Sequence, residues 1–289
     1  MSEPIYRVRG LSKAYDGRVV LDDVSFDIAR GECFVVLGRS GTGKSVLLRH
    51  LNALERPDRG TVAFDGVELQ DLPERELAPL RVRVGMLFQG GALFDSMTVF
   101  ENVAFPLREH RALAEPEIAA RVRQELANVG LPGIEDRMPA ALSGGMKKRV
   151  ALARSLVLEP EALLFDEPTT GLDPVTSASI GRLINETQRG RGMTAVVVTH
   201  DIALARSIAP QGVVSSTTSR CASCRTGRRR DSSRSTWHRR CTTPSSPEAG
   251  SSTSPCRSSC ADGSPSAGNA RSAAPTELRS SPARRRVRS

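Results

Sequence analysis

The first 209 residues contain a single cysteine, Cys33, and no apolar run in the chain approaches the roughly 18 residues that a membrane-spanning helix requires. One cysteine in a stretch of this length is typical of a protein in a reducing compartment such as the cytosol. The chain also lacks, at its start, the basic residues and apolar core of a secretory signal. We therefore expect a protein that is neither exported nor membrane-spanning by itself.

The last 80 residues lack lysine, isoleucine, phenylalanine, tyrosine and methionine altogether. They contain 15 arginines, 4 acidic residues and 20 serines, so residues 210–289 carry a net charge of +11, against −2 for residues 1–209. A stretch with so few large apolar side chains cannot bury enough surface to offset the entropy of ordering. We expect residues 210–289 to be a disordered tail.

Two other interpretations of this tail remain open. Its arginine runs could bind nucleic acid, but Trp237 is the only aromatic side chain available for stacking on bases, so we do not expect nucleic acid as a partner. A stretch rich in Ser, Arg, Pro, Thr and Cys is also what an out-of-frame translation of GC-rich DNA gives. A frameshift near residue 209 is our hypothesis, and the alternative is a genuine basic appendage. If the tail is real, the core lacks its closing strands.

A phosphate-binding pattern, Gly-x4-Gly-Lys-Ser, occupies residues 38–45, directly after a short apolar run. Glycines let backbone N–H groups close around phosphate oxygens, and the helix that follows points its positive end at them. We expect Lys44 to reach the β- and γ-phosphates of a nucleoside triphosphate and Ser45 to ligate Mg²⁺. The residues predicted to bind the nucleotide here are Gly38, Ser40, Gly41, Thr42, Gly43, Lys44, Ser45 and Val46.

The arrangement of apolar runs predicts an α/β fold. Near-continuous runs at 33–37, 82–88, 162–165 and 194–198 favour buried parallel strands, and helical patterns accompany them. Short alternating segments at 5–8, 24–28 and 61–64 favour an antiparallel sheet beside the phosphate loop. We predict a P-loop NTPase domain over residues 1–209, with a RecA-like parallel core, an antiparallel β subdomain and a helical insertion at about 90–145.

Two carboxylates, Asp166 and Glu167, end the apolar run at 162–165, where a doubly wound sheet presents its ligand-binding edge. We expect Asp166 to hold Mg²⁺ and Glu167 to orient or deprotonate the water that attacks the γ-phosphorus. The alternative is that the acidic pair caps a helix beginning at Pro168.

Two further polar residues, Gln89 and His200, follow other predicted strands and so arrive at the same edge of the sheet. Each is a candidate sensor of the γ-phosphate, although a single Gln or His is more often a satisfied structural residue. The predicted catalytic set is Lys44, Gln89, Glu167 and His200, and the predicted magnesium ligands are Ser45, Gln89 and Asp166.

Residues 142–146 open another predicted helix with a hydroxyl group and two glycines, and thereby build a second anion site. A chain with a phosphate loop and this second segment resembles the ATPase subunits of ABC transporters, in which the segment is the signature motif. The resemblance covers residues 1 to about 209. It implies a head-to-tail homodimer, with each ATP held between the phosphate loop of one subunit and the signature helix of the other.

The same resemblance assigns roles to individual residues. Tyr15 stacks on adenine, and Asp173 is the aspartate of the D-loop. Gln89 is the Q-loop glutamine, and His200 is the switch histidine. The residues of the signature motif that contact the nucleotide are Ser143, Gly144 and Gly145.

A narrower resemblance rests on residues 86–110 together with the phosphate loop and the signature helix. These segments are similar to the ATPases of MCE-linked, Mla-type phospholipid transporters. That implies integral-membrane permease subunits and a lipid-binding MCE-type component as partners. It also implies a cytoplasmic protein bound peripherally to the inner face of the inner membrane. The alternatives are a soluble ABC ATPase acting on nucleic acid and a non-functional remnant of a damaged gene.

Overall fold

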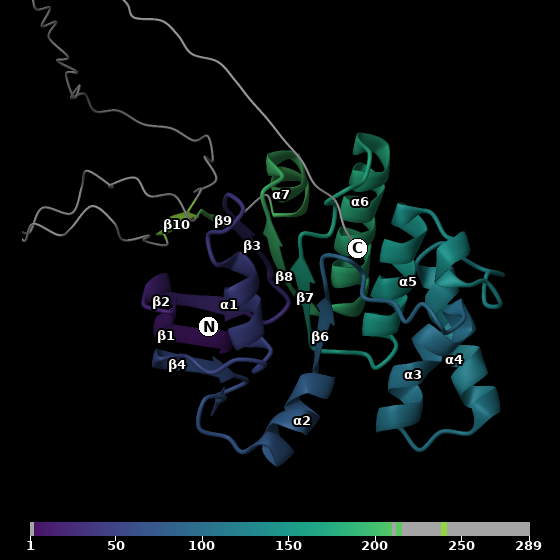
Figure 1. Cartoon of the computed structure of the whole chain (residues 1–289), viewed down its shortest axis with the longest axis horizontal. Coiled ribbons are helices and arrows are strands. Elements are labelled where there is room, and N and C mark those ends of the chain that lie inside the picture. Colours follow the sequence, from purple (N-terminus) through teal and green to yellow (C-terminus); the bar gives the residue numbers. More distant parts are fainter. Residues whose placement is uncertain (1–2, 210–211, 216–237, 242–289) are drawn as a thin grey trace, which may run out of the picture. The chain divides into compact units, whose positions relative to one another are not determined.

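The computed structural model describes residues 3–209, 212–215 and 238–241 (Figure 1). The strands are β1 Pro4–Tyr15, β2 Arg18–Ala29, β3 Cys33–Leu37, β4 Arg59–Phe64, β5 Val67–Glu68, β6 Val84–Leu87, β7 Ala162–Asp166, β8 Thr194–Thr199, β9 Gly212–Ser215 and β10 His238–Cys241. The helices are α1 Lys44–Leu51, α2 Glu74–Val82, α3 Val99–His110, α4 Glu115–Asn128, α5 Gly144–Leu156, α6 Pro174–Arg191 and α7 Ile202–Ile208, with a 3-10 turn at Pro139–Ala141.

The central sheet has the strand order β10-β9-β3-β8-β7-β6, and all of its neighbouring strands are parallel except β10 and β9. Strands β7 and β8 are buried on both faces, as the continuous apolar runs predict. On β8, for example, Val196 and Val198 pack on the face that contacts α1, whereas Ala195 and Val197 pack on the face that contacts α5 and α6. The predicted α/β fold is therefore confirmed.

The second sheet is antiparallel, with the order β2-β1-β4-β5. Its hairpin between β1 and β2 is longer than the predicted strands 5–8 and 24–28, because it continues to the pair Tyr15↔Arg18. Asp16 and Gly17 close the hairpin with positive φ angles of 47° and 76°, the conformation that a two-residue hairpin turn needs. Helix α1 contacts both this sheet and the central one.

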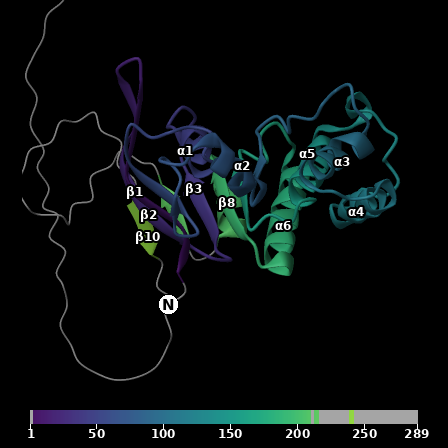
Figure 2. The ribbon, with the colours of Figure 1, turned by 90° about the horizontal axis from the view of Figure 1, so that it is seen from below.

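Helices α3, α4 and α5 pack on one another and gather on the side of the molecule away from β1 and β2 (Figure 2). The stripe of Ile118, Val122 and Leu126 on α4 is buried, as its helical spacing predicts. Thr98 and Glu101 form a capping box at the start of α3. Among the described residues, no helix combines the length and apolar character needed to cross a bilayer.

The chain beyond residue 209 differs in part from the expectation. A real tail implies a core without closing strands, but the structure has β9 parallel to β3, with Val213 opposite Val35 and Val214 opposite Val36. The tail contains almost no other large apolar residues, which explains why no strand was predicted here. Apart from β9 and β10, the residues that we predict to be disordered lie outside the described part of the chain.

Candidate functional site

The phosphate loop connects β3 to α1 and begins beside β8, where the Gly38 N–H donates to the Thr199 carbonyl (3.1 Å). Gly41 and Gly43 have φ angles of 78° and 85°, which favour glycine. A Cβ on Gly43 would also lie 2.8 Å from a methyl carbon of Val20, so the hairpin leaves no room for a side chain. The two glycines thus leave the loop backbone without side chains at the start of a helix, which suits a phosphate group.

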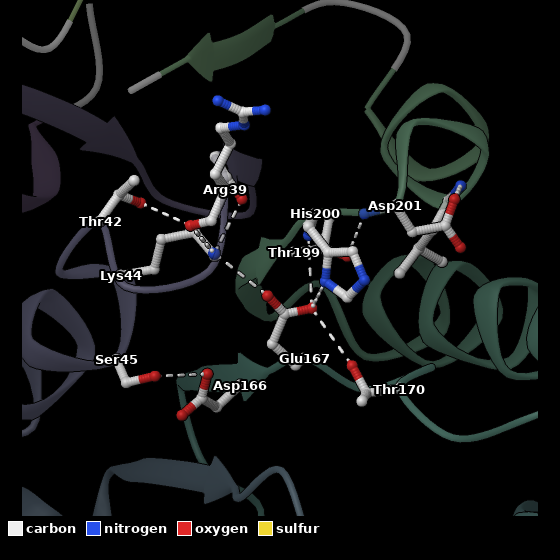
Figure 3. A network of polar contacts seen from close by, with 12 residues as sticks. Arg39, Thr42, Lys44, Ser45, Asp166, Glu167, Thr170, Thr199, His200 and Asp201 are labelled. Carbon is white, nitrogen blue, oxygen red and sulfur yellow. Dashed lines mark hydrogen bonds and ion pairs between the residues drawn. The ribbon is translucent and has the colours of Figure 1, made fainter. Parts of the chain in front are cut away.

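The ammonium group of Lys44 lies inside this loop. Its Nζ donates to the carbonyls of Gly38 (2.8 Å) and Arg39 (2.9 Å), and it lies 3.2 Å from Glu167 Oε1 (Figure 3). The Lys44 side chain is only 4% exposed. A buried positive charge held by loop carbonyls is placed to meet a second anion, as the sequence predicts for a phosphate.

Ser45 and Asp166 meet across the edge of the central sheet, where Ser45 Oγ donates to Asp166 Oδ1 (3.0 Å). Burial raises the pKa of Asp166 and nearby Glu167 adds to the rise, whereas the hydrogen bond from Ser45 opposes it. A hydroxyl and a carboxylate oxygen are ligands that suit Mg²⁺, which commonly takes one or two carboxylates and completes its shell with phosphates and water. Among the described residues, no group of three or more His, Cys, Asp or Glu side chains is placed to hold a metal ion by itself.

Glu167 lies one residue beyond β7 and has a φ of 49°, a strained backbone conformation for a non-glycine residue. Its Oε2 lies 2.7 Å from His200 Nδ1 and accepts from the His200 N–H (3.3 Å) and Thr170 Oγ1 (3.4 Å). Figure 3 shows Lys44 and His200 approaching this carboxylate from two sides. These contacts fix the orientation of the Glu167 carboxylate beside the phosphate loop, as a general base requires.

The alternative role for the acidic pair is wrong. Residues 167–171 form a turn, and the next helix, α6, begins at Pro174 rather than at Pro168. Its cap is Asp173, whose Oδ1 accepts from the N–H groups of Val175 and Thr176 at 3.0 Å each. Hydrogen bonds from Thr176 and Val175 lower the pKa of Asp173.

The signature segment does not lie at the phosphate loop of its own chain. Ser143 caps α5, as predicted, by accepting from the Met146 N–H (3.3 Å). A Cβ on Gly144 would lie 3.3 Å from Leu172, and one on Gly145 would lie 2.6 Å from the Thr176 methyl group. The glycines therefore let α5 approach the start of α6, while Ser143 and Gly144 stay exposed.

Tyr15 contacts other residues than Lys44 and Glu167. Its hydroxyl bonds to Glu55, and the Lys13 ammonium lies 5.6 Å from the ring centroid. Burial, reinforced by the bond to Glu55, raises the pKa of Tyr15 to about 12. The ring is 38% exposed, and its role in stacking on adenine stays a prediction.

Gln89 follows β6 at the predicted edge of the sheet, three strands away from β3, and is exposed. Its carbonyl accepts a hydrogen bond from Lys148 Nζ, which no sequence pattern suggested. Burial lowers the pKa of Lys148, and the carboxylates of Asp166 and Glu167 oppose that shift. Lys148 and Thr170 are thus additions to the predicted set, and only the position of Lys148 in the signature helix could have drawn attention to it.

The fold and this site define a nucleotide-binding protein of the P-loop class. The family model described as ABC transporter matches residues 21–170, and the chain belongs to this family.

Several curated proteins are similar to this chain. A protein named "Probable ribonucleotide transport ATP-binding protein mkl" from Mycobacterium leprae is 46% identical over 201 residues, which are 70% of this chain and 58% of that protein. The chain thus spans less than two thirds of that relative. Proteins named "Intermembrane phospholipid transport system ATP-binding protein MlaF" are 43% identical in Escherichia coli K12 and 41% identical in Haemophilus influenzae. The matched regions cover 70% and 72% of this chain, and 75% and 79% of those proteins.

Solved structures support the same assignment. A dimeric ATP-binding cassette in a post-hydrolysis state, bound to ADP and Pi, is 33% identical with a TM-score of 0.67 and covers 73% of this chain and 93% of its own. The cbiO1 protein from Clostridium perfringens is 35% identical with a TM-score of 0.68, and covers 74% and 85% respectively.

Proposed function

We propose that this protein binds and hydrolyses ATP and thereby drives a membrane transporter. The observation that carries the proposal is the convergence of Lys44, Glu167 and His200 beside the phosphate loop, within contacts of 2.7 to 3.2 Å. The similarity to a cassette solved with ADP and Pi supports the same reaction.

Each side chain has a role in the proposed reaction. The loop N–H groups and Lys44 bind the phosphates and stabilise the charge that develops on them. Glu167 orients or deprotonates the attacking water, and His200 fixes the position of Glu167. Ser45 and Asp166, with Gln89, hold Mg²⁺, which neutralises phosphate charge when bound.

The proposed active unit is a homodimer. Ser143, Gly144 and Asp173 are exposed and lie away from the phosphate loop of their own chain, which suits contact with ATP on a second copy. The similar cassette was solved as a dimer. We assign this unit to residues 1–209, with β9 as an added strand beside β3.

The proposed partners are permease subunits and a lipid-binding MCE-type component, and the proposed location is the inner face of the inner membrane. The MlaF relatives and the resemblance of residues 86–110 support phospholipid as the cargo. The name of the mycobacterial relative refers to ribonucleotide transport instead. A complex purified with its permease should be stimulated by phospholipid vesicles; stimulation by ribonucleotides alone would favour the second cargo, and salt-sensitive retention of nucleic acid would contradict both.

Phosphate release from MgATP by the full chain tests the hydrolysis itself. We expect Lys44→Ala to lose binding of a fluorescent ATP analogue and to release no phosphate above background. If Lys44→Ala hydrolyses ATP as fast as the unmodified chain, the proposed site is wrong.

A further inference from the structure

Helix α5 binds the backbone of the segment that contains Gln89. Three of its side chains donate hydrogen bonds to four carbonyls of residues 86–92, here called the Gln89 segment. The bonds run from Ser155 Oγ to Met86 O (3.1 Å), from Lys148 Nζ to Gln89 O, and from Arg154 to Gly91 O (3.0 Å) and Ala92 O (2.8 Å).

The spacing on α5 explains why these donors face one segment. Lys148, Ala151 and Ser155 are three and four residues apart and so share one face of the helix. Ala151 lies between the donors Lys148 and Ser155, and a Cβ on Gly91 would lie 3.5 Å from its methyl group. Gly91 has a φ of 78°, and its N–H donates to Phe88 O (2.9 Å), so the segment forms a tight turn against the helix. The whole segment is therefore held by α5, not by β6 alone.

Lys148 is the buried member of this set, at 6% exposure. Burying an ammonium group is costly unless it is hydrogen-bonded, and its recorded hydrogen bond goes to the backbone at the residue predicted to reach Mg²⁺ and the γ-phosphate. A donor at that one carbonyl fixes the chain from which the Gln89 side chain projects. The neighbouring Lys147 makes no side-chain hydrogen bond or ion pair with the described residues.

We propose that Lys148 is a positioning residue that holds Gln89 at the carboxyl edge of the central sheet, with Arg154 holding the residues that follow. The inference rests on the proposed function for its effect on hydrolysis, but the contact itself can be tested without ATP. Because α5 also begins with the signature segment, a shift of this helix moves the Gln89 backbone with it.

The first test is hydrogen exchange of the full chain without nucleotide. Lys148→Met keeps the length and apolar stem of the side chain and removes the donor. A charge-assisted hydrogen bond is worth enough that we expect exchange at residues 88–92 to rise by about tenfold. Lys147→Met is the matched control and should leave this exchange unchanged, and Lys148→Arg should restore protection. Equal exchange in Lys148→Met and the unmodified chain overturns the proposal.

The second test separates positioning from general stability. In steady-state hydrolysis, we expect Lys148→Met to raise the Mg²⁺ concentration for half-maximal rate and to lower kcat, each by about fivefold to tenfold, while affinity for a fluorescent ATP analogue changes less than about twofold. A lower kcat with unchanged Mg²⁺ dependence, not rescued by Lys148→Arg, would show a merely structural role. If the unmodified chain releases no phosphate, the proposed function fails, and the exchange result still decides on Lys148.

If Lys148→Met does not fold, as judged by its melting transition, Arg154→Met provides the second variant. It removes the donors to Gly91 O and Ala92 O from a side chain that is only partly buried. We expect faster exchange at residues 91 and 92 and a smaller rise in the Mg²⁺ requirement. Unchanged exchange there overturns the proposal for the segment as a whole.

Discussion

Strand β7 has a glutamate immediately before it and another immediately after it, and the two lie in opposite surroundings. Glu161, at the amino edge of the central sheet, belongs to a closed ring in which each of two arginines pairs with each of two carboxylates. The ring consists of Arg30, Asp65, Arg83 and Glu161, with N–O distances of 2.5 to 2.7 Å. Glu167, at the carboxyl edge, has Lys44 and His200 beside it.

The two edges also differ in burial and in proton affinity. The ring side chains are 33% to 46% exposed, whereas Lys44 and Glu167 are 4% and 10% exposed. Hydrogen bonds from Arg83 lower the pKa of Asp65 and of Glu161, while burial raises the pKa of Asp166. At the amino edge the charged groups pair with one another and stabilise the fold. At the carboxyl edge charged groups are buried, which lowers stability but leaves them in place to bind a ligand.

The largest expected effect comes from the same substitution at the two ends of β7. Glu167→Gln should lower phosphate release by about 10²- to 10⁴-fold, because it removes the proposed base. ATP binding and the closed dimer should persist, since Gln keeps the size of the side chain. Glu161→Gln should leave the rate within about twofold, because Glu161 touches the ring and not the site. Phosphate release and gel filtration with ATP measure both; substantial hydrolysis by Glu167→Gln contradicts the assignment.

The second effect is on stability, and it has opposite signs for the replacement of two aspartates, Asp166 and Asp65. The folded-state pKa of Asp166 lies above its ordinary value of 3.8, so its charge lowers stability as the pH rises through the folded value. Asp65 has a folded-state pKa below 3.8, so its contribution is present above pH 3.8 and is lost as the pH falls through the lower value. At pH 7 without Mg²⁺ and nucleotide, Asp166→Asn should therefore raise the melting temperature, and Asp65→Asn should lower it.

Differential scanning calorimetry with and without MgATP provides the control for the aspartate pair. MgATP should raise the melting temperatures of the unmodified chain and of Asp65→Asn. It should raise the melting temperature of Asp166→Asn much less. Two variants that both destabilise the protein would show that burial does not dominate at Asp166.

The third effect is a loss of stability without a loss of rate. Arg83→Met keeps an apolar stem near Phe64, whose ring centroid lies 5.0 Å from the guanidinium carbon, and removes a partner from both ring carboxylates. After allowance for solvent screening of a one-third exposed group, we expect a loss of about 1 kcal/mol at pH 7. Urea denaturation should show this difference in the free energy of unfolding above pH 4.5, the ordinary pKa of Glu161. The difference should disappear at lower pH as the carboxylates become protonated. A fall in kcat at 25 °C would show that the ring acts on the site.

The sequence predicts which segments meet at the carboxyl edge, because three of its residues directly follow apolar strands. Gly38, Glu167 and His200 come from three parallel strands, and parallel strands bring their carboxyl ends to one edge whatever their order. The order β3-β8-β7-β6 itself cannot be derived from local patterns. This order places Gln89 after β6, three strands from β3, where α5 rather than the phosphate loop contacts its backbone.

The amino-edge ring and the full length of β1 could not be predicted, for physical reasons. Arg30 and Glu161 are 131 residues apart, and nothing in their neighbourhoods marks one as the partner of the other. In β1, register shifts after Val8 and Leu11 break the alternation of buried and exposed residues, so the predicted strand ends at residue 8 instead of 15. Long-range pairing and bulges depend on tertiary structure.

The smallest effect tests whether the four ring residues act as a unit. Arg30 is the more exposed arginine, at 46%, so Arg30→Met alone should cost less than about 0.5 kcal/mol and should cost still less at high salt. With Arg83 already replaced by Met, however, Asp65 and Glu161 depend on Arg30 alone. The second substitution should then cost more than it does in the unmodified chain, by about 0.5 kcal/mol, because contacting members of a network are not additive. Strict additivity in urea denaturation would mean separate surface pairs, and the contrast between the two ends of β7 would then rest on burial alone.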